Sequence, residues 1–262
     1  MSFDAFNLGI LLPALAAGLL VTATHVPLGM QVLARGIVFI DLAVAQIAGL
    51  GVILADVLGW EAHGPAVQVA AFSAALAGAL LLTWTERRWP EVQEAVIGVV
   101  FVLGSSAAIL LLAGNPQGGE HLKELLSGQI LWVGWDRIIA DAVIYAVLFV
   151  LWFLFRERLG RMGFYVLFAC VVTVSVQLVG LYLVFTTLVV PALSTYYSRG
   201  RRMQKAAGVG VSGYVLGLVA SAFTDLPSGA MIVCAMAICG AVLAFAAGRR
   251  EGEGAQQESI SK

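Results

Sequence analysis

Residues 28–55 read LGMQVLARGIVFIDLAVAQIAGLGVILA, and the only charged side chains in this stretch are Arg35 and Asp41. A membrane-spanning helix needs about 20 predominantly apolar residues, so we interpret Arg35 and Gly36 as the boundary between two spans. The whole chain has the same character: 60% of its 262 residues are hydrophobic, 12% are charged and the mean hydropathy is +0.94. Water-soluble domains are about 45–50% apolar and about 25% charged. The sequence therefore predicts an all-α, polytopic membrane helical bundle.

Apolar stretches on both sides of this run predict about nine transmembrane helices. They cover approximately residues 8–31, 36–58, 65–84, 92–113, 136–155, 163–178, 180–197, 206–223 and 229–247. The division between the sixth and the seventh rests on Gln177 and Gly180. One helix over 163–197 would be about 52 Å long, whereas a bilayer core is about 30 Å thick. We therefore expect two short helices there.

Basic residues indicate the orientation of membrane proteins with short loops. With nine spans and the N-terminus outside, only Lys123 and Arg137 of the 15 Lys and Arg residues fall outside the cell. Merging the sixth and seventh spans would move the basic cluster at 199–205 outside as well. We therefore expect one transmembrane domain over residues 1–247 and a disordered cytoplasmic tail, GRREGEGAQQESISK, over residues 248–262.

Charge and motifs exclude several classes of function. A net charge of −1 gives no excess of positive charge for a nucleic-acid partner. The three cysteines, Cys170, Cys234 and Cys239, form no C-x-x-C pair and indicate neither a disulfide framework nor a thiolate metal site. The sequence has no P-loop, H-E-x-x-H or G-x-S-x-G motif. We expect a chain that is not itself an enzyme and holds no cofactor, with the composition of a permease.

Five segments, in order along the chain, resemble one known family. They are the 28–55 stretch, EAVIGVVFVLGSSAAILLL (94–112), LLSGQILWVGWDRI (125–138), VGLYLVFTTLVVPALSTYY (179–197) and TDLPSGAMIVCAM (224–236). Together they resemble the permease subunits of bacterial zinc/manganese ATP-binding-cassette importers, over about residues 28–247.

The resemblance implies an assembly in the bacterial inner membrane. It implies a permease homodimer, two copies of a cytoplasmic ATPase subunit that binds ATP, and a separate extracytoplasmic metal-binding protein. The cargo would be a divalent metal ion, zinc, manganese or iron, moved by alternating access. Two other interpretations stay open: a secondary transporter driven by an ion gradient, for which the sequence shows no internal repeat, and an accessory membrane subunit that transports nothing.

The segment VVPALSTYYSRGRRMQK (189–205) combines a helix-ending proline with basic residues on the expected cytoplasmic side. In the resembled family this region docks the ATPase. The candidate coupling residues are Pro191, Ser194, Arg199, Arg201, Arg202 and Lys205, with Glu94 at the start of the fourth span. The alternatives are that the basic residues only anchor the topology and that Glu94 only stabilises a helix N-terminus.

The candidate substrate path contains Asp41, Gln46, His25 and Asp56. An acid inside a span costs about 2.5–3.5 kcal/mol on insertion scales, so Asp41 is either a metal ligand or a buried acid bonded to a neighbouring helix. For His25, the alternative to a ligand role is a bond to a backbone carbonyl near Pro27.

The second span departs from the family pattern. The family has an acid and a histidine four residues apart on one helical face, whereas aligning GLGVILA (49–55) with its counterpart places Leu42 at the acid and Gln46 at the histidine. Asp41 and Gln46 are five residues apart, roughly 140° around a helix. The family's metal preference therefore does not transfer directly to this chain.

Overall fold

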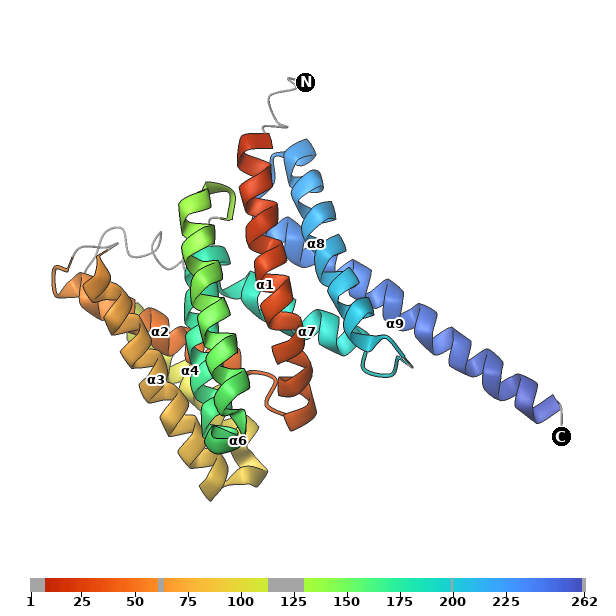
Figure 1. Cartoon of the computed structure of the whole chain (residues 1–262), viewed down its shortest axis with the longest axis horizontal. Coiled ribbons are helices and arrows are strands. Elements are labelled where there is room, and N and C mark those ends of the chain that lie inside the picture. Colours follow the sequence, from red (N-terminus) through yellow and green to blue (C-terminus); the bar gives the residue numbers. More distant parts are fainter. Residues whose placement is uncertain (1–7, 61–63, 113–129, 199, 261–262) are drawn as a thin grey trace.

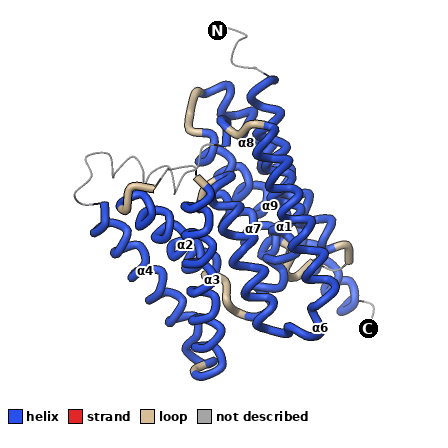
Figure 2. Tube along the Cα trace, turned by 60° about the vertical axis from the view of Figure 1, so that its left-hand side comes forward, coloured by secondary structure: helices blue, strands red, loops and turns tan. Residues whose placement is uncertain are grey.

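The computed structural model describes residues 8–60, 64–112, 130–198 and 200–260. Every regular element in this part of the chain is helical (Figure 2). The α-helices are α1 (Leu8–Arg35), α2 (Ile40–Val57), α3 (Pro65–Arg88), α4 (Gln93–Leu112), α6 (Trp135–Val179), α7 (Leu181–Ser194), α8 (Arg202–Thr224) and α9 (Ser228–Ile260), with short 3-10 turns at Pro90–Val92 and Ile130–Trp132. The predicted all-α membrane bundle is confirmed.

Two glycines divide the long apolar region between α4 and α8. Gly160, with φ 51° and ψ −134°, interrupts α6, so that residues 135–159 and Gly160–Val179 are separate helical parts. Gly180, with φ 87°, separates α6 from α7. Side chains other than glycine rarely adopt positive φ, which explains why the breaks fall at these two positions. Counting both parts of α6, the described residues form nine helical segments, as the sequence predicts.

One boundary differs from the sequence prediction. α7 has only 14 residues and ends at Ser194, whereas the predicted span runs to residue 197. At about 1.5 Å per residue it is about 21 Å long, shorter than the bilayer core. α9 is helical to Ile260, and the predicted disorder of the tail from residue 248 stays a prediction. Its apolar part ends at Ala246, and the Glu, Gln and Ala residues that follow favour helix over coil.

Three helices, α1, α6 and α7, form the centre of the bundle. Figure 1 shows α2 and α3 on one side of the molecule and α8 and α9 on the other, with α1, α6 and α7 between them. In an 18-residue window of the second part of α6, 78% of the residues are buried. The corresponding share is 22% in the span that contains α4. A helix that is apolar on all sides belongs in a bundle interior, and Gly160–Val179 is such a helix.

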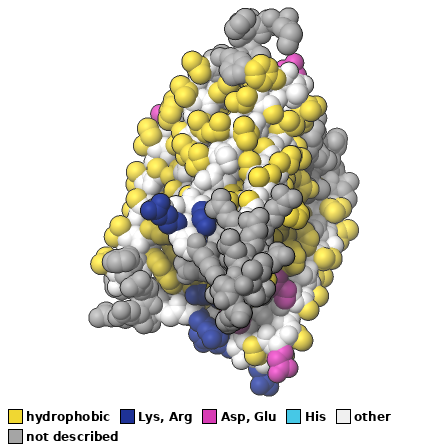
Figure 3. Space-filling view, turned by 90° about the vertical axis from the view of Figure 1, so that its right-hand side faces the viewer, with side chains coloured by type: hydrophobic (Ala, Val, Ile, Leu, Met, Phe, Trp, Pro, Cys, Tyr) yellow, Lys and Arg dark blue, Asp and Glu magenta, His cyan; other side chains and the backbone are white. Residues whose placement is uncertain are grey.

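The start of α1 and the end of α9 lie at opposite ends of the bundle, as an odd number of spans requires. α1 begins near the N label and α9 ends near the C label, at opposite ends of the bundle (Figure 1). One face of the described surface is mostly hydrophobic, with its Lys and Arg side chains in the lower half (Figure 3). The Arg35 guanidinium lies 3.6 Å from the Phe164 ring centroid, and Arg161 lies 3.9 Å from Glu86. These contacts join the C-terminal ends of α1 and α3 to the start of the second part of α6.

Close helix packing depends on glycine at the contact between α8 and α9. A Cβ added to Gly217 would collide with the backbone of Ile232, whereas a Cβ on Gly208 in the same helix would meet nothing within 4 Å. Small residues at such crossings let two membrane helices approach closely.

We therefore predict opposite effects of the same substitution at two sites in α8. Gly217→Ala should destabilise the protein by about 1–3 kcal/mol through overpacking. Gly208→Ala should leave stability unchanged or raise it by about 0.5–1 kcal/mol, because alanine favours helix. Thermal unfolding of the purified variants in detergent measures both. Equal melting temperatures for the two variants would contradict this packing of α8 on α9.

Candidate functional site

Asp41 lies in the first turn of α2 and is completely buried. Neither carboxyl oxygen has a hydrogen-bond partner among the described residues. Burying a charged group is unfavourable unless it is paired and hydrogen-bonded. The alternative of an acid bonded to a neighbouring helix therefore has no support in the described contacts.

Glu94 lies in the first turn of α4, next to this acid. Its Oε1 accepts a hydrogen bond from the backbone N–H of Phe39 at 3.3 Å, and its Oε2 is buried without a hydrogen-bond partner among the described residues. Phe39 lies two residues before Asp41, so this bond places the Glu94 carboxyl group beside the start of α2. The structure thus brings together two acids to which the sequence assigned different roles, one in the path and one in coupling.

Gln46 and Asp56 do not join this pair. Gln46 is buried where α2 crosses α4, and its Cβ would be 3.3 Å from a Cβ placed on Gly104. Asp56 lies fifteen residues beyond Asp41, about 22 Å along the helix axis, and its backbone carbonyl accepts the N–H of Gly59 at the C-terminal end of α2. Among the described residues, no three His, Cys, Asp or Glu side chains converge into a metal-binding group.

His25 is fully buried in α1. Its Nδ1 lies 3.1 Å from the Val21 carbonyl oxygen and 2.9 Å from Thr24 Oγ1. The bond to a backbone carbonyl that the sequence suggested is therefore present. Its Nε2 has no partner among the described residues.

Apart from Glu94 in α4, the described candidate coupling residues lie at the end of α7 and the start of α8. Pro191 and Ser194 are buried, and Ser194 Oγ donates to the Pro191 carbonyl at 3.0 Å. Arg202 Nη2 lies 3.4 Å from the Ala192 carbonyl oxygen, and its guanidinium lies 5.4 Å from the Tyr196 ring centroid. Arg202 therefore holds the turn between α7 and α8.

Tyr196, Tyr197, Gly200 and Arg201 are exposed in this turn. Lys205 is half-buried in the first turn of α8, where its N–H bonds to the Arg201 carbonyl at 3.0 Å. Arg199 lies outside the described residues. A docking surface on this turn would therefore consist of Tyr196, Tyr197 and the basic side chains rather than the buried Ser194.

A polar cluster between the two parts of α6 is not among the sequence candidates. Arg137 Nε donates to Asp141 Oδ2 at 3.0 Å, and Arg137 Nη2 lies 3.4 Å from Gln177 Oε1. One helical turn deeper, the Tyr145 hydroxyl lies 2.6 Å from Ser175 Oγ. The i, i+4 spacing of Arg137 and Asp141 was a visible signal for their ion pair. No local sequence pattern indicated the contact with Gln177, which lies forty residues further along the chain.

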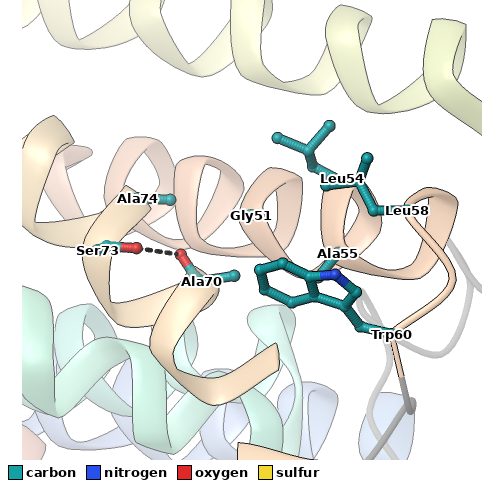
Figure 4. A pocket seen from close by; sticks show the side chains of 8 residues that line it. All are labelled: Gly51, Leu54, Ala55, Leu58, Trp60, Ala70, Ser73 and Ala74. Carbon is teal, nitrogen blue, oxygen red and sulfur yellow. Dashed lines mark hydrogen bonds between the residues drawn. The ribbon is translucent and has the colours of Figure 1, made fainter. Parts of the chain in front are cut away.

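A pocket of about 310 Å³ lies between α2 and α3 (Figure 4). Its lining residues are Gly51, Leu54, Ala55, Leu58, Trp60, Ala70, Ser73 and Ala74. The hydroxyl of Ser73 bonds to the carbonyl oxygens of Val69 and Ala70 in its own helix. Divalent cations require oxygen or nitrogen ligands, so this apolar pocket does not have the lining of a metal path.

Comparison with protein families gives two matching stretches, residues 7–165 and 158–247, both to the ABC 3 transport family. An uncharacterized membrane protein of Synechocystis is 27% identical over 251 residues, which cover 86% of each protein. A Haemophilus influenzae protein named "Probable iron transport system membrane protein" is 26% identical over 163 residues, which cover 54% of this chain and 60% of that protein.

Two solved structures have a similar fold. PsaBC from Streptococcus pneumoniae, solved in complex with a Fab, matches with a TM-score of 0.69 and 20% identity over 90% of each chain. An inward-facing transporter described as of the metal-chelate ABC type matches with a TM-score of 0.64 and 18% identity, over 89% of this chain and 85% of the other.

Topology can be tested at two exposed aromatic residues. Tyr197 is 78% exposed in the turn after α7, and Trp132 is 82% exposed before α6. In a variant with Cys170, Cys234 and Cys239 replaced by alanine, Tyr197→Cys should react with an impermeant maleimide only from the cytoplasm. Trp132→Cys should react only from outside. Labelling of both from one side would contradict the nine-span topology.

Proposed function

The chain belongs to the ABC 3 transport family, and on this basis we propose that it is the permease subunit of an ATP-driven importer for a divalent metal ion, zinc, manganese or iron. The family match over nearly the whole folded chain carries the proposal. The name of the Haemophilus influenzae relative supports a metal cargo. The buried, unpaired Asp41 adds a residue of the kind that ion pathways use.

The proposed assembly contains two copies of this permease, two ATPase subunits and an extracytoplasmic metal-binding protein, in a bacterial inner membrane. The sequence has no P-loop, so the ATPase subunits must supply ATP binding and hydrolysis. Because ATP hydrolysis takes place in the partner subunits of this assembly, the chain itself needs no catalytic motif.

Coupling in this proposal begins at the turn after α7. Tyr197 and Arg201 are exposed to a cytoplasmic partner, while Arg202 fixes the turn to the last carbonyls of α7. α7 in turn packs tightly on α1, because Gly29 lies directly against the Leu188 carbonyl. A displacement of the turn by the ATPase would therefore move α7 and α1 together, and so change which side of the path is open.

Reconstitution separates this proposal from its alternatives. In proteoliposomes the chain alone should neither hydrolyse ATP nor accumulate metal, and it should do both with its ATPase and binding protein. Uphill uptake by this chain alone under a proton or sodium gradient would identify a secondary transporter. ATP hydrolysis by the full assembly without uptake of any of the three metals would identify an accessory role.

Metal preference can be tested at the position of the family histidine. Gln46→His should raise the uptake of zinc relative to manganese several-fold, because imidazole is a better zinc ligand than a neutral amide oxygen. Gln68→His in α3 serves as the matched control and should change nothing. Uptake of both metals, normalised to permease abundance, is the measurement. An unchanged ratio in Gln46→His would show that this position does not line the path.

A further inference from the structure

Arginine side chains from three helices gather at one end of the bundle. Arg87 and Arg88 are the last two residues of α3, and Arg35 is the last residue of α1. Arg161 directly follows the break in α6 at Gly160. All four arginines are exposed. The ends of α1 and α3 lie at the same end of the molecule (Figure 1), which the predicted topology places on the cytoplasmic side.

Two contacts hold these helix ends together. Arg161 Nη1 lies 3.9 Å from Oε1 of Glu86, the residue just before the two arginines that end α3. The Arg35 guanidinium lies 3.6 Å from the centroid of the buried Phe164 ring, and Phe164 is three residues after Arg161. The four arginines therefore form one surface, the arginine patch.

The arginine patch carries a net positive charge. The four arginines, counted together with Glu86 and with the exposed Glu91 in the 3-10 turn after α3, leave a net charge of +2. Neither Arg87 nor Arg88 forms an ion pair with another described residue. Their guanidinium groups are therefore open to an anionic group from outside the chain.

Two tryptophans indicate the depth of the arginine patch in the membrane. Trp84, one turn before Arg88, is 56% exposed, and Trp89, directly after it, is 47% exposed. Their rings meet edge to face, with the centroids 5.3 Å apart. Exposed tryptophan is typical of the headgroup level of a bilayer. The patch therefore lies at the level of the lipid phosphate groups.

The face of α3 that leads to the patch favours a lipid over an acidic protein surface. Leu76, Leu80, Trp84 and Arg87 follow one another at intervals of three or four residues, so they share one face of the helix, and all four are exposed. α3 packs on α2, α4 and α6, whereas the proposed coupling turn lies between α7 and α8. An acyl chain can lie along this face while its headgroup contacts the arginines.

We propose that the arginine patch binds the headgroup of an anionic phospholipid of the inner leaflet. Clusters of about four to eight basic residues at the cytoplasmic ends of membrane helices are typical of such binding. All members of the patch are arginines, whose planar guanidinium group can donate two parallel N–H bonds to one phosphate. The site does not depend on the importer function, because it requires only the bilayer and the described surface.

Native mass spectrometry of the delipidated permease in detergent tests the site. The probes are phosphatidylglycerol and phosphatidylcholine with identical acyl chains, so that they differ only in their headgroups. The wild type should bind phosphatidylglycerol about tenfold more tightly than phosphatidylcholine. Replacing both Arg87→Gln and Arg88→Gln should remove this preference, because each basic residue near an anionic lipid surface contributes about fivefold. Arg201→Gln is the matched control, since Arg201 is exposed in the turn between α7 and α8, and it should keep the preference.

A second measurement needs no variant. Raising the ionic strength from about 0.1 M to about 1 M shortens the Debye length from about 10 Å to about 3 Å, so the preference of the wild type should fall several-fold. A preference that salt does not change would overturn a site made of exposed arginines.

The other outcomes also decide the matter. Equal binding of both lipids by the wild type, or an unchanged preference in the double variant, would overturn the site. An equal loss in Arg201→Gln would show that positive charge in general, rather than this patch, attracts the lipid. Full displacement of the lipid by inorganic phosphate would assign the patch to free phosphate. Loss of the co-purifying ATPase from the double variant, with the lipid preference intact, would assign it to that partner.

Discussion

The lack of water in the bilayer core constrains every part of this structure. Backbone N–H and C=O groups there must bond to one another, so each crossing is helical. Breaks are tolerated only where the surrounding protein meets the same need. At Gly180 the break keeps its bonds, because the Gly180 N–H reaches the Val176 carbonyl at 2.9 Å and the Gly180 carbonyl receives the Val184 N–H at 3.1 Å. The chain can therefore turn inside the bundle without exposing polar backbone to lipid.

The same constraint explains the distribution of polar side chains. Thr22, Thr187 and Ser175 each donate to a carbonyl four residues earlier in their own helices, as hydroxyls in membrane helices do. Arg137 and Asp141 neutralise each other. Both oxygens of Asp41 and Oε2 of Glu94 are buried without a hydrogen-bond partner in the described chain. This contrast, more than the mere presence of acids in spans, distinguishes the corner of α2 and α4 from the rest of the interior.

Local sequence signals predicted most of the fold and only part of the site. Apolar length, basic residues and Gly180 each act over a few residues, and they predicted the helical segments and the break between α6 and α7. The short α7 was not predicted, because apolar composition continues past Ser194 while the helix ends there. The meeting of Asp41 and Glu94 was not predicted either. The bond that joins their helix ends spans 55 residues, and no local pattern encodes that distance.

The short α7 also has a consequence for how this part of the protein is held in the membrane. At about 21 Å it is shorter than a bilayer core of about 30 Å, and only Gly180 lies between it and the buried second part of α6. No loop therefore separates the two helices between residues 160 and 194. α7 packs against α1, α6 and α9, so the neighbouring helices cover a helix that is too short to fill the core by itself.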